Sequence, residues 1–127
     1  MSNGYRLYGG VIAVAGALLL WTLPAQARGP GSYAVSGKDA VNNGAYSGTS
    51  TLTQTGESTW RVTWRVGGTS FTGSGLGDGD VIALNFSGAG RTGVALLRAK
   101  TDGSGYAVSW TYSGDRTVSY EDWRKGR

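Results

Sequence analysis

The segment Trp60-Arg61-Val62-Thr63-Trp64-Arg65-Val66 decides the fold class of this chain. Its large apolar side chains alternate strictly with arginine and threonine, so one face is apolar and the other is polar. This period of two is typical of a strand that is half-buried in a sheet. Residues 106–112 show the same alternation, and nowhere in residues 28–127 do apolar residues recur at helical spacing over three turns. The sequence therefore predicts an all-β protein.

Short turns rich in glycine, asparagine and aspartate separate the apolar runs. They divide the chain into strands near residues 32–37, 45–55, 59–66, 69–75, 81–86, 93–99, 105–112 and 116–124. Because every connection is short, consecutive strands must be antiparallel neighbours. We expect an antiparallel up-and-down meander barrel of about eight strands, since closure removes exposed strand edges. A two-layer sandwich is the alternative.

The amino-terminal residues have the three zones of a secretory signal peptide. Arg6 lies in a short polar start, Val11–Leu23 is an apolar run, and Ala25-Gln26-Ala27 has small residues where signal peptidase reads them. The apolar run is shorter than the about 20 residues that a membrane span needs. We expect residues 1–27 to be a cleaved signal peptide. Residues 28–127 would then be one exported domain, periplasmic or secreted, with no membrane span.

The composition excludes several kinds of chemistry. The 127 residues include no cysteine and no histidine, so no Ser-His-Asp triad, cysteine nucleophile or conventional zinc site can form. The formal net charge of +4 is too small for a dense nucleic-acid-binding patch. We therefore expect a protein that is not an enzyme, has no cofactor or metal, and does not bind nucleic acid.

Two short motifs and the glycine-punctuated meander resemble the calycin type of small barrel, which includes avidins and lipocalins. Gly31-Ser32-Tyr33 lies where that group has a Gly-x-Trp opening, and residues 60–64 are similar to a Trp-x-Val-x-Trp strand of avidins. Tyr33 replaces the family's tryptophan, and the polar set with which avidins hold biotin has no counterpart here. The resemblance thus implies a small exported bacterial barrel, of a kind to which no function is assigned, but not biotin binding.

One group of aromatic side chains is the candidate ligand site. If the alternation is read correctly, these side chains share the inner face of the barrel, where an eight-stranded barrel holds either packed side chains or one small ligand. The candidate ligand-binding residues are Trp60, Trp64, Tyr106, Trp110 and Tyr112. The first functional hypothesis is an exported binding domain for a small, partly apolar molecule. Its alternative is a solid aromatic core.

The second functional hypothesis is a protein-binding envelope factor, such as a secreted inhibitor or an adhesin-like accessory. In that case the core is solid and the loops or the outer face make the contacts. Arg61 and Arg65 share one outer face and are the candidate partner-binding residues. Solubility and protection of strand edges are the alternative role for these arginines.

Two segments contain neighbouring acidic residues, but we do not expect either to form a metal or catalytic site. Gly73–Asp80 faintly suggests a calcium repeat, but it is a single copy with two carboxylates, and a strand end followed by a hairpin turn explains it better. Glu121 and Asp122 are adjacent, so on a strand they point to opposite faces and cannot flank one bond. We expect Asp122 to share a face with Val118 and Tyr120 and to meet an arginine inside the barrel mouth.

Overall fold

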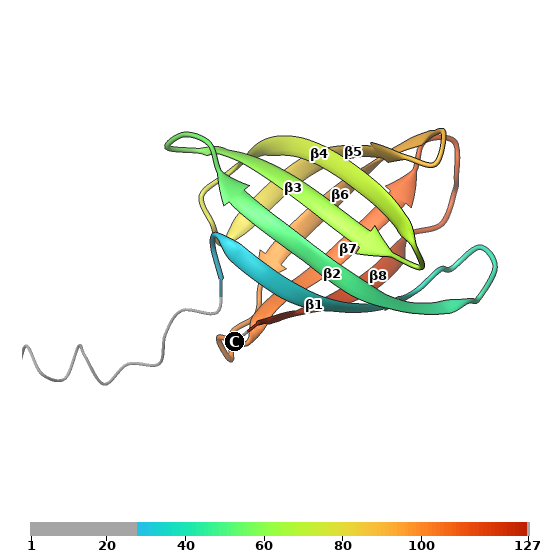
Figure 1. The fold of residues 1–127 in the computed structure, drawn as a ribbon, viewed down its shortest axis with the longest axis horizontal. Coiled ribbons are helices and arrows are strands. Elements are labelled where there is room, and N and C mark those ends of the chain that lie inside the picture. Colours follow the sequence, from blue (N-terminus) through green and yellow to red (C-terminus); the bar gives the residue numbers. More distant parts are fainter. Residues whose placement is uncertain (1–27, 127) are drawn as a thin grey trace, which may run out of the picture.

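The computed structural model describes residues 28–126, which form a closed antiparallel barrel in which each strand pairs with the next along the chain. The eighth strand returns to pair with the first, so the blue β1 and the red β8 lie side by side in Figure 1. The strands are β1 (Gly31–Lys38), β2 (Ala45–Gln54), β3 (Thr59–Val66), β4 (Thr69–Gly77), β5 (Val81–Gly88), β6 (Arg91–Ala99), β7 (Gly105–Tyr112) and β8 (Ser119–Lys125). The expected signal peptide, residues 1–27, lies outside the described residues.

The predicted all-β, eight-stranded, up-and-down barrel is confirmed, and the sandwich alternative is wrong. The main difference concerns the last strand, which begins at Ser119 and not at 116. Hydrogen bonds hold the preceding residues as a loop, because Asp115 N donates to Tyr112 O at 3.0 Å and Thr111 Oγ1 donates to Thr117 O at 3.0 Å. Residues 28–126 contain no helix that is long and apolar enough to cross a membrane.

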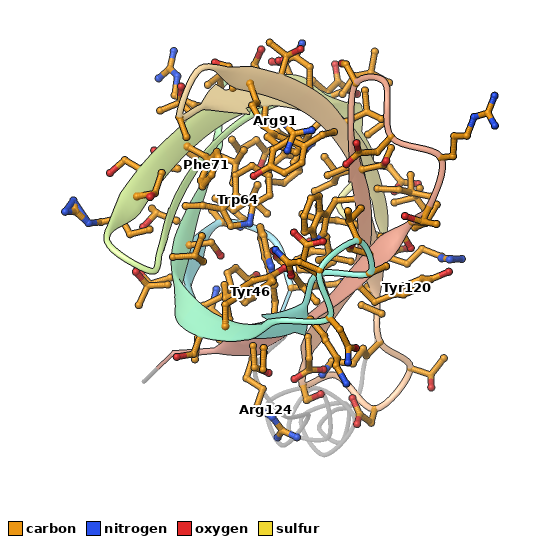
Figure 2. The ribbon with its side chains drawn as sticks, turned by 90° about the vertical axis from the view of Figure 1, so that its right-hand side faces the viewer. Tyr46, Trp64, Phe71, Arg91, Tyr120 and Arg124 are labelled. Carbon is orange, nitrogen blue, oxygen red and sulfur yellow. The ribbon has the colours of Figure 1, made fainter. Side chains whose placement is uncertain are left out.

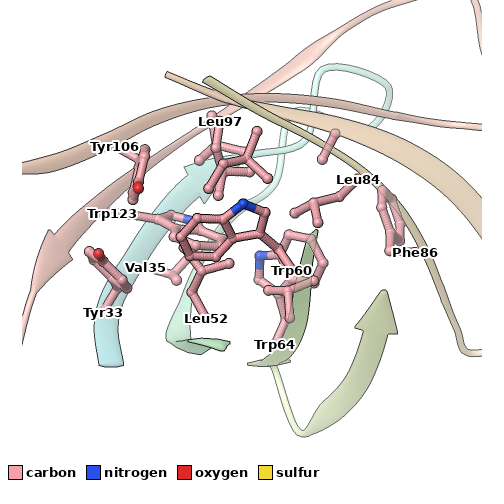
Figure 3. Close-up of a cluster of buried hydrophobic side chains, with 14 of the residues drawn as sticks. Tyr33, Val35, Leu52, Trp60, Trp64, Leu84, Phe86, Leu97, Tyr106 and Trp123 are labelled. Atoms are coloured by element: carbon pink, nitrogen blue, oxygen red, sulfur yellow. The ribbon is translucent and has the colours of Figure 1, made fainter. Parts of the chain in front are cut away.

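The inner face of the barrel is packed with aromatic and aliphatic side chains (Figure 3). The alternation predicted for residues 60–66 is confirmed, because Trp60, Val62 and Trp64 are buried while the arginines and Thr63 between them are exposed. The buried apolar residues are Tyr33, Val35, Leu52, Trp60, Val62, Trp64, Phe71, Ile82, Leu84, Phe86, Ala95, Leu97, Tyr106, Val108 and Trp123. Burial of so much apolar surface supplies the main favourable contribution to folding.

Two glycines on β4 pair with large buried residues of β3. Trp60 lies opposite Gly75, and Val62 lies opposite Gly73. A Cβ atom at Gly73 or Gly75 would lie under 3.0 Å from a backbone carbonyl oxygen of β5. Glycine inside a strand commonly marks a position where another backbone approaches closely. These two glycines therefore let β4 approach β5 closely beneath the aromatic core.

The two ends of the barrel differ. At one end Tyr106 Oη accepts a hydrogen bond from Gly29 N at 2.7 Å and donates one to Gly79 O at 2.6 Å. Tyr33 Oη donates to Gly29 O at 2.5 Å, and Lys125 Nζ donates to Pro30 O at 2.6 Å. Gly29 and Pro30 therefore cover this end, which we call the closed end. The opposite end, toward the viewer in Figure 2, is the mouth.

Candidate functional site

A cavity of about 110 Å³ lies at the mouth of the barrel. It is formed by aromatic side chains from several strands together with two carboxylates. The lining residues are Asp39, Tyr46, Trp64, Val66, Phe71, Phe86, Trp110, Tyr112 and Glu121. Figure 2 shows Tyr46, Trp64 and Phe71 grouped inside the barrel wall, with Arg91 near them. We call this space the mouth cavity.

Backbone pairing brings the polar atoms of the mouth cavity together. Tyr46 on β2 pairs with Gly37 on β1, and Gly37 in turn pairs with Glu121 on β8. A Cβ atom at Gly37 would lie under 3.0 Å from both the Tyr46 ring and Glu121 Cγ. The absence of a side chain at residue 37 therefore allows the tyrosine and the glutamate to meet across β1.

The carboxylate of Glu121 is the centre of a hydrogen-bond network of aromatic donors. Oε2 accepts from Tyr46 Oη at 2.6 Å, and Oε1 accepts from Trp123 Nε1 at 2.7 Å and from Trp64 Nε1 at 3.2 Å. Trp110 Nε1 donates to Tyr46 Oη at 2.8 Å and so extends the network to β7. These bonds orient the indole and phenol rings around one acid, which makes the site a preformed one.

Burial raises the pKa of Glu121, and its three hydrogen-bond donors act in the opposite direction. Among the described residues, none of the ion pairs includes Glu121. Burial and the neighbouring charge of Glu121 also raise the pKa of Tyr46, so its phenol stays protonated and remains a donor. The mouth cavity therefore contains an acid whose charge is stabilised by dipoles and not by a basic side chain.

Charged side chains also lie at the rim. The Arg91 guanidinium lies 3.8 Å from the centroid of the Tyr112 ring, and its Nη2 is 3.3 Å from Asp115 Oδ1. Asp39 Oδ1 accepts a hydrogen bond from Val41 N at 2.8 Å, which shapes the loop between β1 and β2. The cavity lining itself includes Asp39 and Glu121 but neither lysine nor arginine.

The five predicted ligand residues are divided between the two ends. Trp64, Trp110 and Tyr112 line the mouth cavity. Trp60 and Tyr106 lie in the filled part of the core, where Trp60 Nε1 donates to Gly77 O at 2.9 Å. The candidate partner-binding residues Arg61 and Arg65 are both exposed on the outer face of β3, as expected.

The acid of the site was not predicted from the sequence. Asp122 was expected inside the mouth with Val118 and Tyr120, and this expectation was wrong: Tyr120 is exposed, and Asp122 pairs outside with Lys100 and with Arg124 Nε at 3.4 Å. The buried Trp123 sets the inward face of β8, so Glu121 points inward with it. The two-residue spacing between Glu121 and the largest apolar residue of that strand was the available signal.

Tyr46, Phe71 and Phe86 were also missed. Phe71 and Tyr46 are isolated aromatic residues in strands rich in serine, threonine and glycine, where the contrast between faces is weak. Phe86 lies on the buried face of β5, and only the closed barrel places the end of that face at the mouth. The Asp78 carboxylate of the glycine-rich stretch accepts from Asp80 N at 2.9 Å and so shapes the turn between β4 and β5.

The raised pKa of Glu121 predicts a pH dependence of stability. From its ordinary value of 4.5 up to the raised pKa, the folded protein binds more protons at this group than the unfolded protein does. The stability that the neutral acid contributes is therefore present in full below about pH 4.5 and is lost as the pH rises through the folded pKa. As the pH rises from 4.5 to 7, the wild type loses this stability and Glu121→Gln, which has no carboxyl there, does not. We therefore expect the free energy of unfolding of Glu121→Gln to increase relative to that of the wild type over this range.

Urea unfolding of both proteins across this pH range measures the effect. Hydrogen bonds to Ser104 hold the pKa of Asp102 low, so this group lowers the stability as the pH falls below 3.8. That change lies outside the pH range compared here. Carbon NMR can follow the titration of the Glu121 carboxyl directly. Its midpoint should be unchanged in the control Asp122→Asn, which alters the other face of β8. A midpoint at or below 4.5 for Glu121 would contradict the prediction.

Comparisons with known proteins add no family to this description. No family model matches the chain, and neither a curated protein nor a solved structure does. The likeness to avidins and lipocalins therefore receives no support from them. The protein is an eight-stranded, closed, antiparallel β-barrel with an aromatic cavity at its mouth.

Proposed function

We propose that this barrel is a binding domain for a small, partly apolar molecule that enters the mouth cavity. The observation that supports it is a concave, mostly aromatic site with a few converging polar groups, which is the usual composition of a small-molecule site. The volume of about 110 Å³ can be compared with engineered apolar cavities of ~150 Å³ that bind benzene. The ligand is therefore small, or it inserts one end.

The network around Glu121 favours binding in this cavity over simple core filling. Buried tryptophan and tyrosine need an acceptor even in a filled core, where Trp60 uses a backbone carbonyl, but at the mouth one carboxylate serves both Tyr46 and Trp64. Such preorganisation lowers the entropy that binding would otherwise cost.

We propose a role without catalysis, because the chain lacks the histidine and cysteine of common nucleophile–base pairs. We propose that the role is extracytoplasmic, as the signal-peptide pattern of residues 1–27 implies.

A fragment titration followed by the indole N–H signals in NMR tests the proposal. Fragments of one ring or a branched alkyl group should shift the signals of Trp64 and Trp110, which line the cavity. The signal of Trp60 should stay in place, because its N–H is bonded to Gly77 O near the closed end. Trp110→Ala should weaken binding by about tenfold or more, given the loss of aromatic contact area. A fragment set that shifts neither Trp64 nor Trp110 would overturn the proposal.

A second candidate function, protein binding, has one observation in its favour. Apolar side chains remain exposed on the outer face around a shallow hollow across β4 to β7, including Leu76, Val94, Leu96 and Val118. Exposed apolar patches often mark interaction sites. A partner that uses this surface should be lost with Leu96→Asp and kept with Arg61→Ala. The reverse result would place the contact on the arginine face of β3.

A further inference from the structure

We infer that the mouth cavity binds the alkylammonium group of a small organic cation, such as a methylated amine. This inference rests on the proposed function and adds to it the charge and chemical class of the ligand. Three independent features support it: the arrangement of the aromatic rings, the sign of the charges in the lining, and the hydrogen-bond state of Glu121.

The aromatic rings form walls that meet at steep angles. Trp110 and Tyr112 lie with centroids 5.1 Å apart and planes 78° apart, and Phe86 and Trp110 lie 6.2 Å and 76° apart. Trp64 and Phe86 are 5.4 Å apart at 64°. Because these rings touch one another, a ligand cannot lie between them, but their different directions let them line the mouth cavity on more than one side. Ring faces carry negative electrostatic potential and attract cations, and aromatic cages for quaternary ammonium groups use this attraction.

The charges in the lining have one sign. Asp39 and Glu121 contribute two carboxylates, and no basic side chain lines the cavity. The nearby guanidinium of Arg91 already pairs with Asp115 and stacks on Tyr112. An anionic ligand would meet two like charges, whereas a cation would meet complementary ones. The stacking of Arg91 on Tyr112 also shows that the aromatic rim accommodates a cation.

Glu121 has remaining capacity to bind a positive group. A carboxylate can accept about four hydrogen bonds. Oε1 of Glu121 accepts two and Oε2 accepts one, from Tyr46. Burying a carboxylate without an opposite charge is costly, and a neutral ligand that removed its remaining water would increase that cost. A cationic ligand is the occupant that compensates the buried charge: a protonated amine can donate to the free acceptor site, whereas a quaternary head, which has no N–H, acts through its charge alone.

The size of the cavity matches such a group. A volume of about 110 Å³ is smaller than the engineered cavities of ~150 Å³ that hold benzene, so it suits a compact head group. A trimethylammonium head has one nitrogen and three carbons around it, and the rest of the ligand would extend out of the mouth. A long apolar chain would not fit inside, because the core between the cavity and the closed end is filled.

Choline and its neutral analogue 3,3-dimethylbutan-1-ol are the probes that test the inference, since they differ mainly in the charge of the branched head. Titrated into the purified protein at pH 7, choline should bind at least tenfold more tightly than the alcohol and should shift the indole signals of Trp64 and Trp110. Glu121→Gln should reduce this preference for choline to less than threefold. Asp122→Asn removes a carboxylate from the outer face of the same strand and should leave the preference unchanged.

A pH series supplies a second readout that does not depend on a variant. The groups that face Glu121 or lie around the cavity are Tyr46, Asp39, Tyr112, Arg91 and Asp115. Burial raises the pKa of both tyrosines, so they stay protonated in this range, whereas Glu121, whose pKa burial also raises, takes up a proton and loses its charge as the pH falls. The affinity for choline should therefore fall at least fivefold from pH 7 to pH 4, while that for the alcohol should change less than twofold.

The possible outcomes separate this inference from the proposed function. If the alcohol binds as tightly as choline at Trp64 and Trp110, the charge inference is wrong and the small-molecule site stands. If neither probe binds but a neutral or anionic fragment shifts the same two signals, the inference is again wrong and the proposed function stands. If no probe or fragment shifts Trp64 or Trp110, both are wrong.

Discussion

Gly75→Ala is expected to destabilise the barrel by about 3 kcal/mol or more, a large part of the roughly 5–15 kcal/mol by which a domain is stable. The added Cβ would lie under 3.0 Å from the carbonyl oxygen and carbon of Ala83 and from Leu84 Cα, all backbone atoms of β5. Backbone atoms in a paired strand cannot rotate away as the end of a side chain can. The strand pair β4–β5 must therefore separate locally, and Trp60, which lies opposite Gly75 on β3, loses its packing surface.

Urea unfolding of the wild type and two variants measures this effect. Ser74→Val is the matched control, because residue 74 is exposed on the outer face of the same strand and a β-branched residue suits a strand. We expect Ser74→Val to change the free energy of unfolding by less than about 0.5 kcal/mol. A loss below about 1 kcal/mol for Gly75→Ala would show that β5 can move away at little cost, and would contradict the close approach described for these strands.

The fold could be predicted from the sequence because three strands alternate, two of them clearly, and all connections are short. The segments at 60–66, 81–86 and 106–112 present large apolar side chains every second residue, and the short turns leave few topologies other than a meander. The last strand was predicted to begin too early because Val118 was read as part of an apolar face. The structure leaves Val118 exposed in the preceding loop.

The site could be predicted only in part, because alternation identifies a face and not a position along the barrel axis. Trp60 and Trp64 lie on the same face of β3, yet the first fills the core and the second lines the mouth cavity. Which end stays open depends on contacts remote in sequence, such as that of Gly29 with Tyr106. Glu121 was missed because the face shared by Val118, Tyr120 and Asp122 was taken as the inner face of β8. Its donors come from three other positions, Tyr46, Trp64 and Trp123.

Trp123→Ala is expected to cost about 3–5 kcal/mol of stability, since removal of a fully buried aromatic side chain leaves a large cavity. Trp123 is 0% exposed and has three aromatic neighbours. Its ring centroid is 5.5 Å from that of Tyr33, 5.6 Å from Trp64 and 6.2 Å from Tyr106. It also belongs to β8, whose pairing with β1 closes the barrel, so its loss weakens the seam between the first and last strands.

Hydrogen exchange of backbone amides can show that the seam is the weakened part. In Trp123→Ala the amides of β1 and β8 that bond across the seam should lose more protection than those between β3 and β4, where Trp60 and Val62 keep their partners. Tyr120→Ala is the control on the same strand, because Tyr120 is 64% exposed and its loss leaves no cavity. Equal loss of protection in both strand pairs would mean that the barrel opens only as a whole.

Trp123→Phe separates the packing contribution of this residue from its hydrogen bond. Phenylalanine keeps an aromatic ring against Tyr33 and Tyr106, so the loss of stability should be smaller than for alanine. It cannot donate to Glu121 Oε1, and that bond is one of those that lower the pKa of the acid. The carboxyl of Glu121 should therefore titrate at a higher pH in Trp123→Phe than in the wild type. An unchanged titration with reduced stability would mean that Trp123 acts by packing alone, and that Tyr46 and Trp64 suffice to hold the charge at the barrel mouth.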